Sequence, residues 1–98
     1  MNSFYLAGKI SEVGLKTQTN SGTNMCRLKL SVEKNNREQD ITNEIYEVVL
    51  FRSLADKDYE VGDSVAISGK LQANNYEKDG SSYYNCNLIA SSVYLMNG

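Results

Sequence analysis

The clearest pattern in this chain is the stretch Cys26-Arg27-Leu28-Lys29-Leu30-Ser31-Val32-Glu33, in which apolar and polar residues alternate. Successive side chains of a β-strand point to opposite faces of a sheet, so the alternation predicts a strand with one buried and one solvated face. Residues 65–73 follow the same rule, with Val65, Ile67 and Leu71 as the apolar set. The two segments indicate a β-sheet core.

Further segments rich in β-branched or aromatic residues predict strands at residues 4–10, 45–51 and 83–89, with a short one at 93–96. Turn-forming residues concentrate at 17–24, 34–43 and 77–82, which predicts hairpin loops. Residues 53–60 are the one helical candidate, with Ser53 as a possible N-cap. This order predicts an all-β fold, a five-stranded OB-fold barrel with one short helix between strands three and four, formed by residues 1–98 as a single domain.

Composition restricts the function. Of the 98 residues, 41% are hydrophobic and 22% are charged, with a net charge of −2, as in ordinary soluble proteins. No apolar run is long enough for a signal peptide or a membrane span, so we expect a cytoplasmic protein with no membrane partner. Histidine is absent, which excludes Ser-His and Cys-His nucleophiles and imidazole zinc sites. We therefore expect no enzyme activity, no catalytic residue, no metal and no cofactor.

The two cysteines lie in predicted strands. Cys26 and Cys86 both fall in the apolar set of their segments, and no CxxC pair is present. We interpret them as two buried thiols in a reducing compartment, with a disulfide as the less favoured alternative.

Basic residues are concentrated near the N-terminus. The first 37 residues carry six basic and two acidic side chains, and Arg27 and Lys29 share the polar set of one strand. They could follow a phosphate backbone, and a merely solvated strand face explains them equally well.

The third predicted strand has more apolar residues than one buried face can use. In Val48-Val49-Leu50-Phe51, apolar side chains occupy both faces. If Tyr46, Val48 and Leu50 point inward, the outer face carries Ile45, Glu47, Val49 and Phe51. Aromatic rings beside cations suit unstacked bases, whereas a subunit interface or cover by the short helix would also explain this face.

Tyrosine is abundant, at seven residues. Tyr76 and Tyr83 flank the predicted loop at 77–82, and Tyr76 continues the polar set of Lys70, Gln72 and Asn74. These two tyrosines are candidate ligands for nucleic acid. Tyr84, which alternates with Cys86 and Leu88, is expected in the core, and Tyr5, Tyr59 and Tyr94 are expected to be packing residues.

Nearly the whole chain resembles the bacterial and phage single-stranded-DNA-binding proteins that have one OB domain per chain. The most specific segment is Glu44-Ile45-Tyr46-Glu47-Val48-Val49-Leu50-Phe51 followed by Leu54-Ala55-Asp56, which is similar to the third strand and helix start of that family. Residues 62–72 fit the G-[DS]-x-V-x-[IV]-x-G-x-L pattern of its fourth strand, and residues 4–10 and 28–32 resemble its first two strands.

The resemblance implies sequence-independent binding and protection of single-stranded DNA during replication, recombination or repair. It implies stacking by Phe51 and Tyr76 and phosphate contacts by Arg27, Lys29, Arg52 and Lys70. Tyr83 beside the hairpin loop, and Lys34 and Arg37 in the basic segment, complete the set of candidate DNA-binding residues. The resemblance also implies a homodimer or homotetramer, with replication or recombination proteins as further partners.

Three departures from the family predict weaker binding per subunit: Ile45 replaces the usual aromatic, Asn36 stands where a second aromatic is common, and Glu47 adds a negative charge. The chain ends at Gly98 without the acidic tail of cellular members. This ending is typical of a phage or plasmid variant, which would act in the host cytoplasm, or of an excised domain. The alternative function is an OB-fold protein-interaction adaptor, such as a primosomal or recombination accessory protein, which the net negative charge favours.

Overall fold

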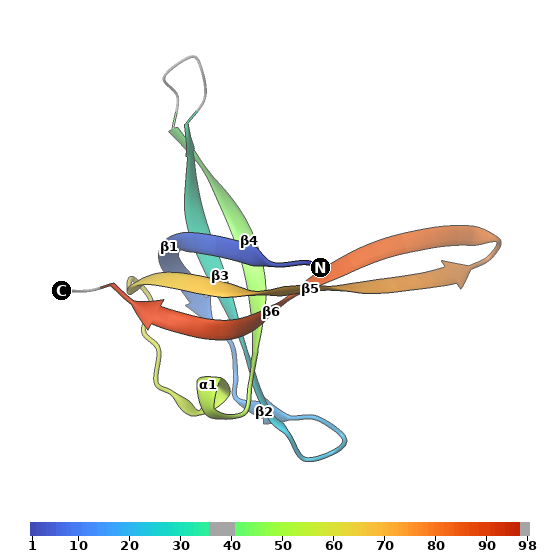
Figure 1. Ribbon diagram of the computed structural model, residues 1–98, viewed down its shortest axis with the longest axis horizontal. Coiled ribbons are helices and arrows are strands. Elements are labelled where there is room, and N and C mark those ends of the chain that lie inside the picture. The colour runs from blue at the N-terminus through green and yellow to red at the C-terminus, as the bar shows by residue number, and fades with distance from the viewer. Residues whose placement is uncertain (36–40, 97–98) are drawn as a thin grey trace.

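Five long strands close into a barrel in the computed structural model, which describes residues 1–35 and 41–96 (Figure 1). The elements are β1 (Phe4–Val13), β2 (Thr17–Gln18), β3 (Asn24–Asn35), β4 (Ile41–Phe51), α1 (Ser53–Asp56), β5 (Ser64–Lys78) and β6 (Ser81–Leu95). The sheet order is β1-β5-β6-β4-β3-β2, and β1 also pairs with β3. That last pairing closes the ring, so the predicted five-stranded barrel with a short helix after the third long strand is confirmed.

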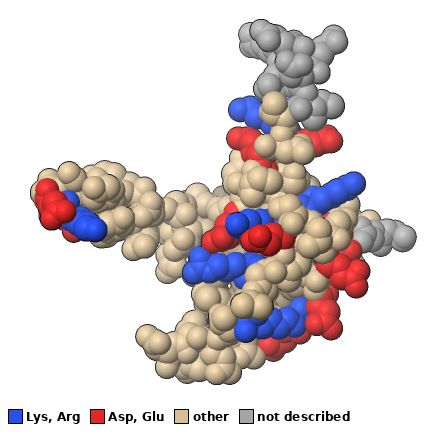
Figure 2. Space-filling view, turned by 180° about the vertical axis from the view of Figure 1, so that it is seen from behind, with Lys and Arg blue, Asp and Glu red and all other residues tan. Residues whose placement is uncertain are grey.

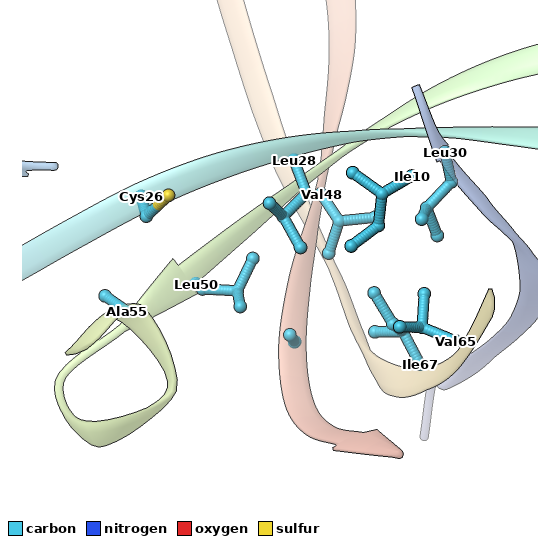
Figure 3. Packing of buried hydrophobic residues seen from close by; sticks show 10 residues of the cluster. Ile10, Cys26, Leu28, Leu30, Val48, Leu50, Ala55, Val65 and Ile67 are labelled. Atoms are coloured by element: carbon cyan, nitrogen blue, oxygen red, sulfur yellow. The ribbon is translucent and has the colours of Figure 1, made fainter. Parts of the chain in front are cut away.

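The inward-facing residues of the strands form one core (Figure 3). In the β3–β4 ladder, Leu28 lies opposite Val48 and Cys26 opposite Leu50, and all four are buried. The alternation in β3 therefore places its apolar set inside the barrel, as predicted. Among the described residues, the buried members of the core cluster are Ile10, Cys26, Leu28, Leu30, Val48, Leu50, Ala55, Val65, Ile67 and Ala90.

The hairpin turns are tighter than predicted. Register pairs continue to Asn35 opposite Ile41 in the β3–β4 hairpin, so much of the predicted loop at 34–43 is strand. The predicted loop at 77–82 shrinks to Asp79 and Gly80, whose φ angles of 52° and 79° match a type I′ turn. Residues 93–96 form no separate strand because β6 continues to Leu95, and residues 17–24 include β2. Cross-strand pairing has thus overridden local turn preference.

The helix is shorter than predicted. It ends at Asp56 instead of residue 60, and Ser53 is its first residue instead of its N-cap. The N-cap position belongs to Arg52, which makes no capping side-chain hydrogen bond, and Lys57 is already extended. The Tyr59 hydroxyl donates a hydrogen bond to the Leu54 carbonyl over 2.7 Å, so the chain turns back after one helical turn. Across the described residues, no helix has the length and apolar character needed to cross a membrane.

The β5–β6 hairpin leaves the barrel as an arm, defined here as residues 70–87 (Figure 1). Every described residue of this β5–β6 arm is exposed. Tyr84, at 78% exposure, and Cys86 are therefore not in the core, and both expectations were wrong. An inward-facing residue is buried only while its strand remains part of the barrel. Tyr5 and Tyr94 are also exposed where packing was expected, whereas Tyr59 does pack against the core.

Candidate nucleic-acid interface

One row of residues runs across four strands on the outer surface of the barrel. Arg27 of β3 lies opposite Val49 of β4, Val49 lies opposite Ile89 of β6, and Ile89 lies opposite Lys70 of β5. Directly opposite residues share a sheet face, so the outward sides of these strands are continuous. At the centre of the row Val49 is only 6% exposed and Ile89 is half-buried, so Arg27 and Lys70 are its exposed ends. We call this surface the candidate face; its residues are Met25, Arg27, Lys29, Ser31, Ile45, Glu47, Val49, Phe51, Lys70, Gln72, Asn74, Tyr76, Tyr83, Asn85, Asn87 and Ile89.

Aromatic rings occupy two separate places on the candidate face. Phe51, at the end of β4, lies opposite Met25 and is half-buried. Tyr76 and Tyr83 lie opposite each other on the β5–β6 arm, with ring centroids 5.1 Å apart and planes inclined by 17°. The two tyrosines therefore form one stacked pair, and each covers one ring face of the other. Ile45, which is 56% exposed, adds an apolar but non-aromatic surface.

Two cations of the candidate face are already paired. Arg27 Nη1 donates a hydrogen bond to Glu47 Oε1 over 2.9 Å, and Lys29 Nζ lies 3.1 Å from Glu12 Oε2. All four side chains are roughly half exposed. Exposed ion pairs contribute only about 0–1 kcal/mol, so a phosphate group can compete for both cations. Because Arg27 offsets the negative charge of Glu47, Glu47 repels a phosphate group less than an unpaired carboxylate would. The same ion pair also reduces the positive charge that Arg27 can offer to DNA.

The remaining predicted cations are more scattered. Lys70 lies on the candidate face at the base of the β5–β6 arm, and Arg52 follows Phe51 as an exposed residue. Lys34, opposite Thr42, is on the other face of the β3–β4 hairpin from Arg27 and Lys29. Arg37 lies outside the described residues. The candidates that share one face are thus Phe51, Tyr76, Tyr83, Arg27, Lys29 and Lys70.

Lys9 is a cation that the sequence analysis did not assign to the site. It lies opposite Ser31, which in turn lies opposite Ile45, so it extends the candidate face onto β1. Its side chain is exposed and makes no ion pair with another described residue. The alternation of Tyr5, Ala7 and Lys9 with apolar Leu6 and Ile10 could have indicated this position.

Charges of both signs are interleaved over the barrel, and the view in Figure 2 shows no continuous basic patch. On the same view the β5–β6 arm shows charge near its tip, where Glu77, Lys78 and Asp79 lie, and none along the length between the tip and Lys70 at its base. On the face seen in this view, a phosphate group would therefore meet individual cations and not a broad positive field.

The groups with a resolved pKa shift point away from the candidate face. Burial raises the pKa of the Cys26 thiol, which keeps it protonated in the core. Burial also raises the pKa of Tyr59, whose hydroxyl bonds the Leu54 carbonyl. The negative charge of Glu44 raises the pKa of Tyr46, and the Tyr46 hydroxyl donates a hydrogen bond to that carboxylate.

Comparisons with known proteins concern the fold and the family of this chain. The small single-stranded DNA-binding protein from Streptomyces coelicolor superposes with a TM-score of 0.62 at 20% identity, over 97% of this chain and 94% of that chain. A deletion mutant of the single-stranded DNA binding protein from Thermus aquaticus superposes with a TM-score of 0.79 at 20% identity, over 100% of this chain and 51% of that chain. At such identities the likeness concerns the fold. A search of curated protein sequences returns no match. The model of the single-strand binding protein family matches residues 1–96, and the chain belongs to that family.

Proposed function

We propose that this chain binds single-stranded DNA along the candidate face and thereby protects it during replication, recombination or repair. The proposal rests on one observation: a continuous outer surface carries Phe51, the Tyr76–Tyr83 pair and the cations Arg27, Lys29 and Lys70 in a member of this family. The role is binding, without a chemical step.

Affinity would come from two sources. Stacking of a base on an aromatic ring contributes about 1–3 kcal/mol, and each phosphate that meets a cation releases a counterion. To bind a phosphate group, Arg27 must give up its ion pair with Glu47, and Lys29 must give up its ion pair with Glu12. The binding of each subunit is therefore modest and strongly dependent on salt.

The test is a fluorescence titration with a dT oligomer at several salt concentrations. For a single strand, log K falls with log salt by about 0.7 per neutralised phosphate, so contacts by Arg27, Lys29 and Lys70 imply a slope near −2, and a further contact by Lys9 would make it steeper. Absence of binding at ~50 mM salt would contradict the proposal.

Glu47→Gln is expected to tighten binding of the dT oligomer by up to about fivefold at low salt, because it releases Arg27 from its ion pair. Glu60→Gln removes the same charge from an exposed residue outside the candidate face and serves as the control. The prediction fails if the two variants change the affinity equally, since the effect would then be one of net charge.

We also propose that the chain assembles with copies of itself into a dimer or tetramer. Tyr5 and Tyr94, both largely exposed, border an uncharged groove lined also by Leu6, Ala7, Ala66, Ile67, Ser68 and Ser92. Beside this groove, residues 4–8 of β1 pair with β5 along one edge. Within the described part of the chain, no strand pairs with their other edge. Light scattering should give two or four times 10.9 kDa and a lower mass for Tyr94→Ser. A monomeric wild type would instead favour the adaptor function, with another protein in the groove.

A further inference from the structure

Side-chain amides are concentrated on one face of the β5–β6 arm. Gln72 lies opposite Asn87 and Asn74 lies opposite Asn85, and the next row is the Tyr76–Tyr83 pair. The four amides are exposed, and none of their side chains hydrogen-bonds to another described residue. An amide offers two N–H donors and a carbonyl acceptor, so this face presents unused donors and acceptors beside a stacked aromatic pair.

The other face of the same arm is different. Its residues are Leu71, Ala73, Asn75, Glu77, Ser82, Tyr84 and Cys86. Apart from Asn75 and the two residues near the tip, Glu77 and Ser82, this face is apolar or aromatic. The period-two alternation of both strands therefore places four of the five amides of the arm on one face, and Asn75 is the exception.

The amide-bearing face lacks the charge needed to attract phosphate. Between Lys70 and Glu77 on β5, and between residues 81 and 87 on β6, the arm has no charged side chain. Figure 2 shows this uncharged length between the barrel and the tip. A DNA strand that runs from the barrel cations onto the arm would meet no cation between Lys70 at the base and Lys78 at the tip, so the contacts available over that length are to bases.

Bases of a single strand expose edges on which a donor stands next to an acceptor, and an amide is complementary to such an edge. Residues directly opposite in an antiparallel pair have Cβ atoms about 5 Å apart, so Asn74 and Asn85 can approach the same base. We propose that the amide face of the β5–β6 arm binds the edges of unpaired bases by hydrogen bonds, as a salt-independent contact added to stacking and phosphate binding. This inference rests on the proposed DNA-binding function. It specifies that the arm binds the edges of the bases and not the phosphates.

The experiment compares two oligomers of equal length and charge. One is a dT oligomer, and the other carries 2,4-difluorotoluene in place of thymine, which keeps the ring shape and removes its strong hydrogen-bonding groups. The wild type should bind the dT oligomer about two- to tenfold more tightly, the value of one ordinary hydrogen bond. In Asn74→Ala/Asn85→Ala this ratio should fall to about one, while the slope of log K against log salt stays unchanged.

Asn75→Ala is the matched control, because Asn75 has the same side chain on the opposite face of the same strand and is also exposed. It should keep the wild-type ratio. Wild-type binding of both oligomers with equal affinity would overturn the inference and leave DNA binding intact, whereas failure to bind the dT oligomer would reject the proposed function itself. A double variant with an unchanged ratio and a lower mass by light scattering would also overturn the inference, since the amides would then hold a second copy.

Discussion

Phe51→Ala is expected to weaken the binding of a dT oligomer by about 5- to 150-fold, which corresponds to ~1–3 kcal/mol of lost stacking. Phe51 is the ring on the barrel part of the candidate face, and Arg27 lies on the neighbouring strand of the same face. A base stacked on Phe51 would therefore place its phosphate near a cation. Fluorescence titration at fixed salt measures the effect.

Tyr84→Ala is the control for this variant, because Tyr84 is a largely exposed aromatic residue on the other face of the β5–β6 arm. It should leave the affinity close to that of the wild type. Phe51 is half-buried, so the unfolding temperature of Phe51→Ala must be measured as well. A folded Phe51→Ala protein with unchanged affinity would show that the ring has a structural role only.

Leu50→Ala is expected to lower the free energy of unfolding by about 2–5 kcal/mol, because the substitution leaves a cavity in a closed core. Leu50 has 0% exposure and lies opposite Cys26, within the cluster that also includes Ala55 of α1. The total stability of a domain is only about 5–15 kcal/mol, so this loss is a large fraction of it.

Urea denaturation followed by circular dichroism measures the loss. Leu15→Ala removes the same atoms from a residue that is 88% exposed, and it should change the free energy of unfolding by less than about 0.5 kcal/mol. Equal effects of the two substitutions would show that the barrel interior is not packed as described.

The barrel could be predicted because its evidence is local. The alternation in β3 and in the first half of β5 identified the inward-facing residues, and Val48 and Leu50 are buried as the outer-face assignment of Phe51 required. Tyr46 of the same inward set is only half-buried, and Val49 of the outer set is buried. Phe51, Arg27 and Lys29 could be placed on one face for the same reason, since a strand has only two faces.

Other features of the candidate site depend on which strands meet. The stacking of Tyr76 on Tyr83 follows from the register of the β5–β6 hairpin, and the ion pair of Arg27 with Glu47 follows from the register of β3 with β4. Neither register can be predicted from the residue pattern of a single strand. The amides of β5 and β6 likewise form a single face only because Asn74 and Asn85 lie opposite each other.

The sequence by itself determined the number and order of the long strands, the side of each strand that would be apolar, and the absence of imidazole chemistry. Only the tertiary structure decided where the barrel ends. Tyr84 and Cys86 continue the apolar set of Leu88, yet they are exposed because β5 and β6 extend beyond the other strands. Periodicity states which residues share a face, whereas burial requires a second surface to cover that face, and only the packing of distant segments supplies it.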